Sequence, residues 1–210
     1  IYLCRLDGRN VMYRNLGNWK FEDTTAATGT ACPSQFSSGA TFADVDGDRD
    51  LDLFVTAMGQ SNRLFRNDGN GKFTDISATA GVQIRSSATK VPMAKSLGVS
   101  PVDLDGDGWV DFIVANDTVH NFVFKNKKDG TFTEMGGISG IGFDNNGKVR
   151  GAMGIDVARF RNDDSLGIGI GNFANEMTAL YVSTPNNQLL FTDNAITEGV
   201  GPDSRLLLKF

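Results

Sequence analysis

The chain has 210 residues, 40% of them hydrophobic, with 20 Lys and Arg against 25 Asp and Glu and a formal net charge of −5. It is long enough to bury a sizeable core, and its 25 glycines against 5 prolines favour an all-β protein with many turns over a disordered chain. It carries no basic stripe that would indicate nucleic-acid binding, and no apolar run approaches the ~20 residues of a membrane span.

The N-terminal segment holds one predicted hairpin and both cysteines. Tyr13-Arg14-Asn15 and Phe21-Glu22-Asp23 flank the turn residues Leu16-Gly17-Asn18, an order typical of two strands joined by a tight turn. Cys4 and Cys32 are compatible with one disulfide that closes a short loop in an oxidising, extracellular space. The alternative is two unpaired thiols, one of them buried in a strand.

Two nine-residue acidic loops, 44–52 and 103–111, follow in the same register. Each has Asp at loop positions 1, 3, 5 and 9 and Gly at position 4. Converging negative charges repel one another unless a cation lies among them, and hard oxygen ligands in a flexible loop favour Ca²⁺ over Zn²⁺ or Cu²⁺. We predict two Ca²⁺ sites, with the side chains of Asp44, Asp46, Asp48, Asp52 and of Asp103, Asp105, Asp107, Asp111 as ligands, and with the backbone carbonyls of Asp50 and Trp109 at position 7.

Two other interpretations of these loops are weaker. Asp and Gly also make turns without metal, but a shared register in two copies argues against chance. An EF-hand would need Glu at loop position 12 and a helix after the loop, whereas position 12 is Val55 or Val114. The β-rich runs 51–56 and 110–115 predict that each loop joins two strands.

The hairpin recurs along the chain, so the sequence is a repeat. Its pairs are Phe65-Arg66-Asn67 with Phe73-Thr74-Asp75, Phe124-Lys125-Asn126 with Phe132-Thr133-Glu134, and Tyr181 with Phe191-Thr192-Asp193. Self-similarity at a fixed period is the signature of repeat architectures. We expect four repeats in one segment, at about 1–35, 36–94, 95–150 and 151–210.

A third loop is predicted from a glycine that precedes each acidic loop by five residues. Gly39 and Gly98 have an equivalent in Gly154, which places the third loop at 159–167. Arg159 and Arg161 replace two of its ligands, and only Asp163 keeps a ligand carboxylate. We predict that this loop binds no metal, and that one of the arginines supplies the positive charge by pairing with Asp163 or Asp164.

Both chain ends fall inside the repeat. Residues 1–4 align with 53–56, and Leu207-Leu208-Lys209-Phe210 stops near the point where another loop would begin. We expect the chain to be part of a longer repeat protein, with further blades supplied by that sequence or by another chain.

The phrases Phe42-Ala43-Asp44-Val45-Asp46, Leu64-Phe65-Arg66-Asn67 and Gly71-Lys72-Phe73-Thr74-Asp75 resemble the FG-GAP/VCBS repeat of integrin α-subunit propellers. They are most similar to bacterial secreted proteins related to cartilage acidic protein, of the ASPIC/UnbV type. The resemblance implies a β-propeller segment of about 3.5 to 4 four-stranded blades within a larger ring. It also implies Ca²⁺ at the two intact loops, and a secreted, cell-surface or periplasmic location.

The function we expect is a non-catalytic, Ca²⁺-stabilised scaffold that binds protein or carbohydrate, as in cell adhesion. His120 is the only histidine, and neither cysteine has a positioned base, so no catalytic residue is predicted. Trp19 and Trp109 could stack on sugars, but the sequence favours Trp19 at a hairpin tip and Trp109 packed beside its loop. The alternatives are a carbohydrate-active enzyme, such as a polysaccharide lyase on a propeller, and a structural subunit of a larger assembly.

Overall fold

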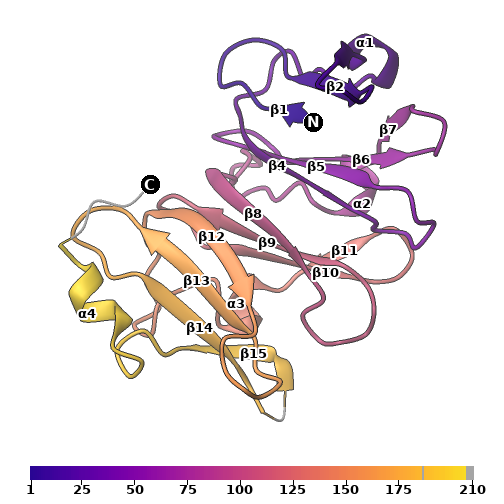
Figure 1. Cartoon of the computed structure of the whole chain (residues 1–210). Coiled ribbons are helices and arrows are strands. Elements are labelled where there is room, and N and C mark those ends of the chain that lie inside the picture. Colours follow the sequence, from indigo (N-terminus) through magenta and orange to yellow (C-terminus); the bar gives the residue numbers. More distant parts are fainter. Residues whose placement is uncertain (186, 207–210) are drawn as a thin grey trace.

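The computed structural model describes residues 1–185 and 187–206, in which four antiparallel sheets follow one another along the chain (Figure 1). Within each sheet, strands that are consecutive in sequence are hydrogen-bonded neighbours, as in the blade of a propeller. We call the sheets blades 1 to 4: β1–β3 (Tyr2–Leu3, Val11–Asn15, Phe21–Asp23), β4–β7 (Ser37–Ala43, Asp52–Ala57, Arg63–Asn67, Phe73–Asp75), β8–β11 (Ser96–Val102, Asp111–Asn116, Phe122–Asn126, Phe132–Glu134) and β12–β15 (Ala152–Ala158, Gly167–Asn172, Ala179–Thr184, Asn187–Asp193). The all-β prediction is confirmed.

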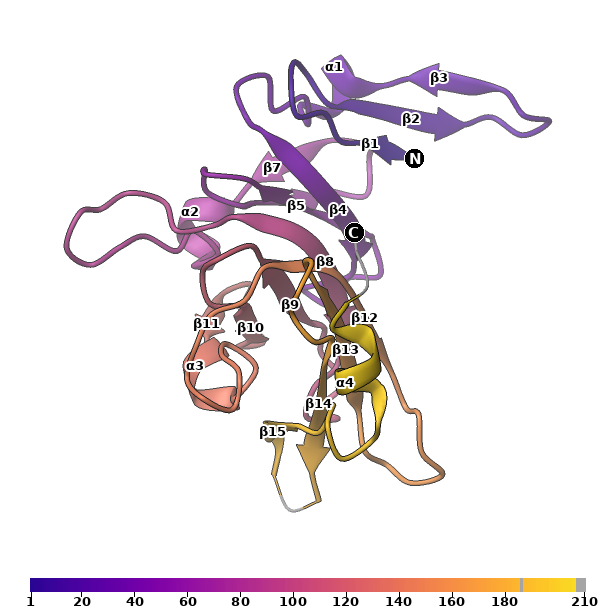
Figure 2. The ribbon, with the colours of Figure 1, turned by 90° about the vertical axis from the view of Figure 1, so that its left-hand side faces the viewer.

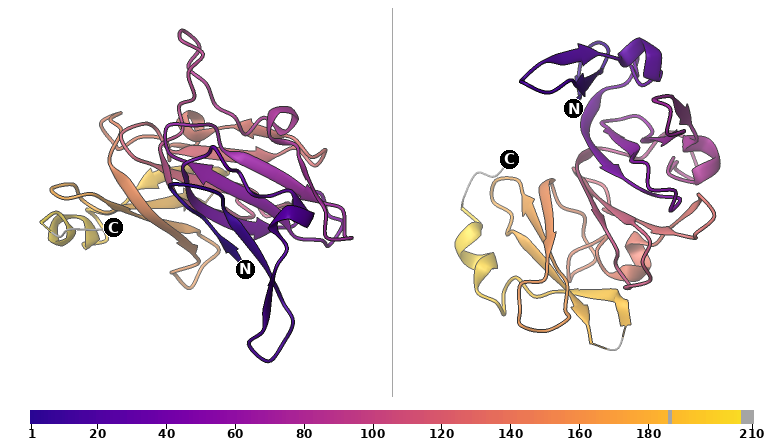
Figure 3. Two further views of the ribbon diagram at one scale, coloured as in Figure 1. Left: turned by 90° about the horizontal axis from the view of Figure 1, so that it is seen from above. Right: turned by 45° about the vertical axis from the view of Figure 1, so that its right-hand side comes forward.

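The blades lie around an arc that is not closed into a ring. Figure 3 (right) shows them succeeding one another, with blade 1 and blade 4 on opposite sides of the opening. The first strands of neighbouring blades pack together, β4 on β8 and β8 on β12. The segment 207–210, which we aligned with the start of another repeat, lies outside the described residues.

The glycine that precedes each acidic loop follows a bulge in the first strand of its blade, and Gly98 lies close to the next blade. The first strand bulges between Ser37 and Gly39 in blade 2 and between Ser96 and Gly98 in blade 3. A Cβ atom at Gly98 would lie 3.1 Å from the carbonyl oxygen of Met153 in blade 4. The repeat therefore keeps glycine because a larger residue would push the adjacent blade away.

The predicted hairpins form the outer half of each blade. Asn15 pairs with Phe21, Asn67 with Phe73 and Asn126 with Phe132, which is the same register in three blades. In blades 1 to 3 the acidic residue that ends the last strand accepts a hydrogen bond from the backbone NH two residues later and begins a one-turn helix. These helices are α1 (Thr25–Thr28), α2 (Ser77–Ala80) and α3 (Gly136–Ser139); α4 (Val200–Ser204) follows blade 4 at a greater distance.

Two hairpins project from this framework. Figure 2 shows the hairpin of β2 and β3 extending away from the other blades, and Trp19 near its tip is 92% exposed. Between α2 and β8, Ser86 N donates to the carbonyl of Val91 and closes a second hairpin. The predicted position of Trp19 at a hairpin tip is confirmed.

The hydrophobic core lies between the blades. Three buried clusters fill the three blade interfaces, and the largest joins blades 2 and 3 through phenylalanine rings. The ring centroid of Phe54 lies 4.6 Å from that of Phe112 and 6.0 Å from that of Phe124. Because the apolar faces belong to different repeats, each blade depends on its neighbour for stability.

Replacing Phe54 by Ala should therefore lower the free energy of unfolding by about 3–5 kcal/mol, the range for a fully buried phenylalanine. Urea denaturation measures the change, and Trp19→Ala serves as the exposed control, with an expected change within about 0.5 kcal/mol. Equal effects of the two substitutions would show that the blade interface is not the core of the molecule.

Candidate metal sites

The two intact acidic loops have one backbone design. Asp44 at position 1 accepts hydrogen bonds from the NH groups of Gly47 (2.8 Å) and Arg49 (2.9 Å). Asp103 accepts the NH of Gly108 (2.8 Å), which is equivalent to Arg49, and the NH of Asp107 (3.0 Å), which is one position later in the loop than Gly47. The first carboxylate thus closes the turn, and the glycine at position 4 has the positive φ that the turn requires, +78° in the first loop and +72° in the second.

The carboxylate at position 9 is buried and joins distant segments. Asp52 and Asp111 are 1% and 0% exposed. Asp52 accepts the NH of Val45 at the start of its loop (2.9 Å) and the NH of Asn67 at the end of β6 (2.8 Å). Asp111 does the same with Leu104 (3.0 Å) and Asn126 (2.8 Å). Each loop is therefore fixed to the hairpin of its own blade.

Three of the four predicted ligand side chains come together in each loop. Ligand oxygens lie within 4.8 Å of one another for Asp44, Asp46 and Asp48 in the first loop, and for Asp103, Asp105 and Asp111 in the second. Asp52 and Asp107 stand outside these groups. The position-7 residues Asp50 and Trp109 lie where the sequence placed them, just before the second strand of the blade, and the metal-binding role of their carbonyls remains a prediction.

The first loop carries negative charge that the protein does not balance. Burial raises the pKa of Asp52 to about 6. Burial and the nearby Asp48 and Asp44 also raise the pKa of Asp46, whereas Arg66 lowers it only weakly. Raised carboxylate pKa values show that the surroundings disfavour the ionised forms, which is the condition that a bound cation relieves.

The second loop has a cation of its own. The ammonium nitrogen of Lys125 lies 3.1 Å from Asp105 Oδ1, 2.8 Å from Asp107 Oδ2 and 3.2 Å from Asp111 Oδ1. Its hydrogen bond is the main cause that lowers the pKa of Asp107 to about 2. Burial alone would lower the pKa of Lys125, but the aspartates outweigh it and raise that pKa. Residue spacing did not predict this contact, although Lys125 lies in the recurring hairpin, next to the residue whose NH binds Asp111.

The chemistry of the donors fits a hard divalent cation in both loops. All the gathered ligand atoms are carboxylate oxygens, the type that Ca²⁺ and Mg²⁺ prefer. Asp105 Oδ1 is buried and has no hydrogen bond, because its contact with Lys125 lies off the hydrogen-bonding direction. A buried carboxylate oxygen that accepts no hydrogen bond is suited to a metal ligand.

The third loop is filled by a side chain. Gly167 stands at the position of Asp52 and Asp111, and the ring of Phe160 covers it so closely that a Cβ atom at Gly167 would overlap the ring. Arg161 lies over the same ring, 5.0 Å from its centroid, and pairs with Glu198. The ion pair we predicted between Arg159 and Asp164 is present at 2.9 Å, but it is exposed and lies away from any buried charge.

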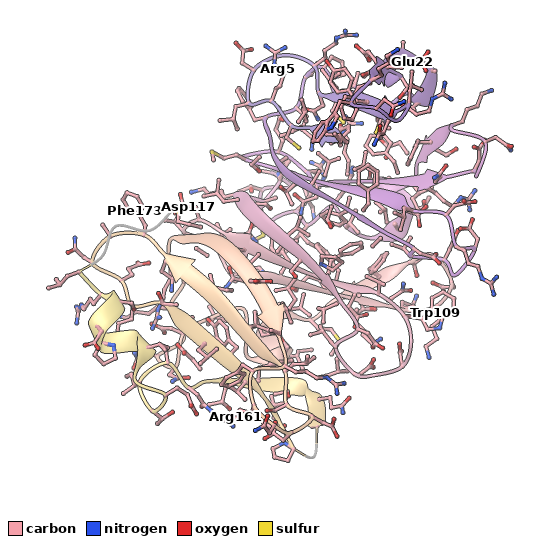
Figure 4. All side chains as sticks on the ribbon, in the orientation of Figure 1. Arg5, Glu22, Trp109, Asp117, Arg161 and Phe173 are labelled. Carbon is pink, nitrogen blue, oxygen red and sulfur yellow. The ribbon has the colours of Figure 1, made fainter. Side chains whose placement is uncertain are left out.

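The two intact loops touch across the blade interface. A Cβ atom at Gly47 would lie 3.3 Å from the indole of Trp109, so the second loop packs on the turn of the first. Asn126 Nδ2 also donates to the carbonyl of Val45 at 2.8 Å. Figure 4 labels Trp109 and Arg161 at the loop ends of their blades, and Asp117 with Phe173 at the opposite ends. We predicted Trp109 beside its own loop; the structure instead packs its ring on the turn of the first loop, in the neighbouring blade.

The cysteines are free thiols rather than a disulfide. Cys32 and the partly buried Cys4 belong to one apolar cluster between blades 1 and 2, and the hydroxyl of Tyr2 donates to Cys32 Sγ at 3.7 Å. Burial raises the pKa of both thiols, that of Cys4 to about 11. Of the two sequence interpretations, a pair of thiols with one buried matches the structure, although Cys32 lies outside any strand.

His120 packs as a structural residue. Its ring lies 5.0 Å from Phe122 and 5.7 Å from Phe143, and its Nε2 atom is 3.8 Å from Glu134 Oε2. Burial alone would raise the pKa of Glu134, but the contact with His120 and the NH groups of Gly136 and Val123 outweigh it, so this pKa is lowered.

A carboxyl whose pKa is lowered on folding stabilises the protein above its ordinary pKa of 4.5, and that contribution is lost as the pH falls through the folded value. Glu134→Gln should therefore be less stable than the wild type at neutral pH, and the gap should narrow as the pH falls below 4.5. Urea denaturation across this range measures it. Glu22→Gln, in an exposed ion pair, is the control, and a gap that stays constant with pH would contradict the role of Glu134.

The close packing of the Phe160 ring on Gly167 is tested by adding a methyl group at Gly167. Gly167→Ala should lower the free energy of unfolding by about 1–3 kcal/mol, as overpacking does. Gly169, two residues along the same strand, has open space where its Cβ would be, so Gly169→Ala should cause no such loss. Adding Phe160→Ala to Gly167→Ala should relieve the overlap. Chemical denaturation measures the stabilities, and equal stability of Gly167→Ala and Gly169→Ala would contradict this packing.

Comparison with known families agrees with the repeat seen in the structure. A family model described as an FG-GAP-like repeat matches residues 1–55, 44–94 and 103–167, which include both acidic loops and the degenerate third loop. No curated protein matches the chain. The resemblance to FG-GAP repeats is confirmed, and the narrower resemblance to the ASPIC/UnbV type remains a prediction.

Proposed function

Because the chain belongs to the FG-GAP-like repeat family, we propose that it is a non-catalytic binding or structural module whose acidic loops hold Ca²⁺. The observation that carries this proposal is the paired set of carboxylates at equivalent points of blades 2 and 3. Ca²⁺ takes six to eight oxygen ligands, and each loop gathers three carboxylates toward that number, with the carbonyl of Asp50 or Trp109 as a further proposed ligand.

The ion would act on the fold through the chain's own contacts. When bound, it supplies positive charge and oxygen coordination at the loop. Asp52 and Asp111 would then keep their hydrogen bonds to Asn67 and Asn126 without the cost of an unbalanced buried charge. Because those bonds connect the loop to the third strand, the same charge balance fixes the register of the blade.

The packing of His120, the only histidine in the sequence, also agrees with a scaffold role. The packing of His120 between Phe122 and Phe143 gives it no nucleophile to activate. We propose a protein or carbohydrate ligand, and an extracellular, cell-surface or periplasmic setting, on the strength of the family. No helix in 1–185 or 187–206 is long and apolar enough to cross a membrane.

Further blades are the other partner that we propose. Blade 1 has three strands where blades 2 to 4 have four. Ile1, Leu3 and Leu6 are 59%, 50% and 54% exposed on this blade. An apolar blade face is normally covered by its neighbour, so a preceding blade, from more of this protein or from another chain, would bury these side chains.

The calcium proposal is tested with variants that remove one carboxylate and keep the shape of the side chain. Each site should stabilise the protein by about 2.7 kcal/mol at a Ca²⁺ concentration 100 times its Kd. Because each kcal/mol raises the melting temperature by ~2–4 °C, each bound Ca²⁺ should raise it by about 5–10 °C. EDTA should remove this increase. Asp46→Asn and Asp105→Asn should each lose one contribution, and the double variant should lose both.

Asp7→Asn, on the exposed surface of blade 1, is the matched control and should keep the full response to Ca²⁺. Differential scanning calorimetry with and without EDTA measures the shifts. A melting temperature that neither Ca²⁺ nor EDTA changes would contradict the proposed function.

A further inference from the structure

We propose that Lys125 is a built-in counter-cation of the second acidic loop, which holds blade 3 together without metal and makes this loop the weaker of the two Ca²⁺ sites. The first half of the inference stands on the contacts of Lys125 alone. The second half rests on the proposed Ca²⁺ binding.

The ammonium group takes a place among the predicted metal ligands. Its three carboxylate partners, Asp105, Asp107 and Asp111, are positions 3, 5 and 9 of the loop, at 2.8–3.2 Å. The side chain of Lys125 is 12% exposed, so the group is directed inward rather than into solvent. Charge-assisted contacts of this length are among the stronger polar interactions in proteins.

The first loop lacks this arrangement although the hairpins are equivalent. Arg66 occupies the place of Lys125: Arg66 pairs with Thr74 across its hairpin as Lys125 pairs with Thr133. No ion pair within 4.0 Å joins Arg66 to the first loop among the residues that the structure describes. A guanidinium is planar and broad, whereas an ammonium is a compact point charge that fits between carboxylates.

A second lysine reinforces the difference. Lys128 Nζ lies 3.2 Å from Asp107 Oδ2, and the equivalent residue of the first hairpin is Gly69, which has no side chain. Asp107, which both lysines contact, stands outside the group of converging oxygens, and that group contains Asp111 instead. The first loop keeps its position-5 aspartate, Asp48, within the group.

A divalent ion can enter the second loop only if the ammonium leaves. Two cations about 4 Å apart repel, and a tethered ammonium competes at a high effective concentration. The long, flexible side chain of Lys125 allows the ammonium to move out of the loop, but the ammonium then loses its three carboxylate contacts. The Kd of the second site for Ca²⁺ should therefore be at least about tenfold higher than that of the first site.

The test compares Lys125→Met with Lys127→Met, a neighbour in the same hairpin whose side chain is 51% exposed and pairs with Asp129 outside the loop. Calcium is titrated calorimetrically into protein freed of metal, and Asp105→Asn identifies the second site. The wild type and Lys127→Met should show two unequal sites. Lys125→Met should bind at the second site at least about tenfold more tightly, with the first site unchanged.

The melting temperature in EDTA tests Lys125 without any metal. Lys125→Met should melt several degrees lower than the wild type, because three carboxylates lose their counter-charge, while Lys127→Met should not change. If Lys125→Met does not fold, Arg66→Lys provides the converse test: it should weaken Ca²⁺ binding at the first site severalfold.

Equal affinities in the wild type, or a second site that Lys125→Met does not strengthen, would overturn the claim about the weaker site. Unchanged melting of Lys125→Met in EDTA would overturn the counter-cation itself. Absence of Ca²⁺ binding in every variant would instead reject the proposed function, and the EDTA comparison would still decide the role of Lys125.

Discussion

A buried carboxylate at the start of the second strand is the contact on which each intact blade depends. Asp52 and Asp111 are shut off from water, yet each accepts NH groups from the start of its loop and from the end of the third strand. Such a group stabilises the fold only when its charge is balanced, because an unpaired buried charge is strongly destabilising. The need for a cation is thus built into the way the loop, strand and hairpin are joined.

The three loops meet this need in three ways. In the first, no side chain in the described part of the chain forms an ion pair with the ligand aspartates, and burial raises the pKa of Asp52 to about 6. In the second, Lys125 lies among the carboxylates. In the third, the carboxylate is replaced by Gly167 and the ring of Phe160 takes the space. The repeat therefore keeps one backbone design while the group that occupies the loop varies from blade to blade, and blades 2 and 3 are connected where Trp109 packs on Gly47.

The features set by local spacing could be predicted from the sequence. The hairpin registers, the turn at each acidic loop and the loss of ligand carboxylates in the third loop all follow from residues close together in the chain, and the recurrence of Gly39 and Gly98 located the third loop through Gly154. The occupants of the loops could not be predicted, because Lys125 reaches Asp111 from another strand, and Phe160 covers Gly167 through a side-chain contact that residue spacing does not show. The sequence suggested a disulfide between Cys4 and Cys32, and the structure has two thiols in an apolar cluster.

The most direct test is a crystal structure of this chain grown with Ca²⁺, with anomalous diffraction data to locate the ions. The account predicts a strong peak among Asp44, Asp46 and Asp48, and a weaker peak in the second loop, present only where Lys125 has swung away. It predicts none over Phe160 and Gly167, where the ring fills the loop. An ion bound in the second loop with Lys125 still in place, or no ion in either acidic loop, would contradict it.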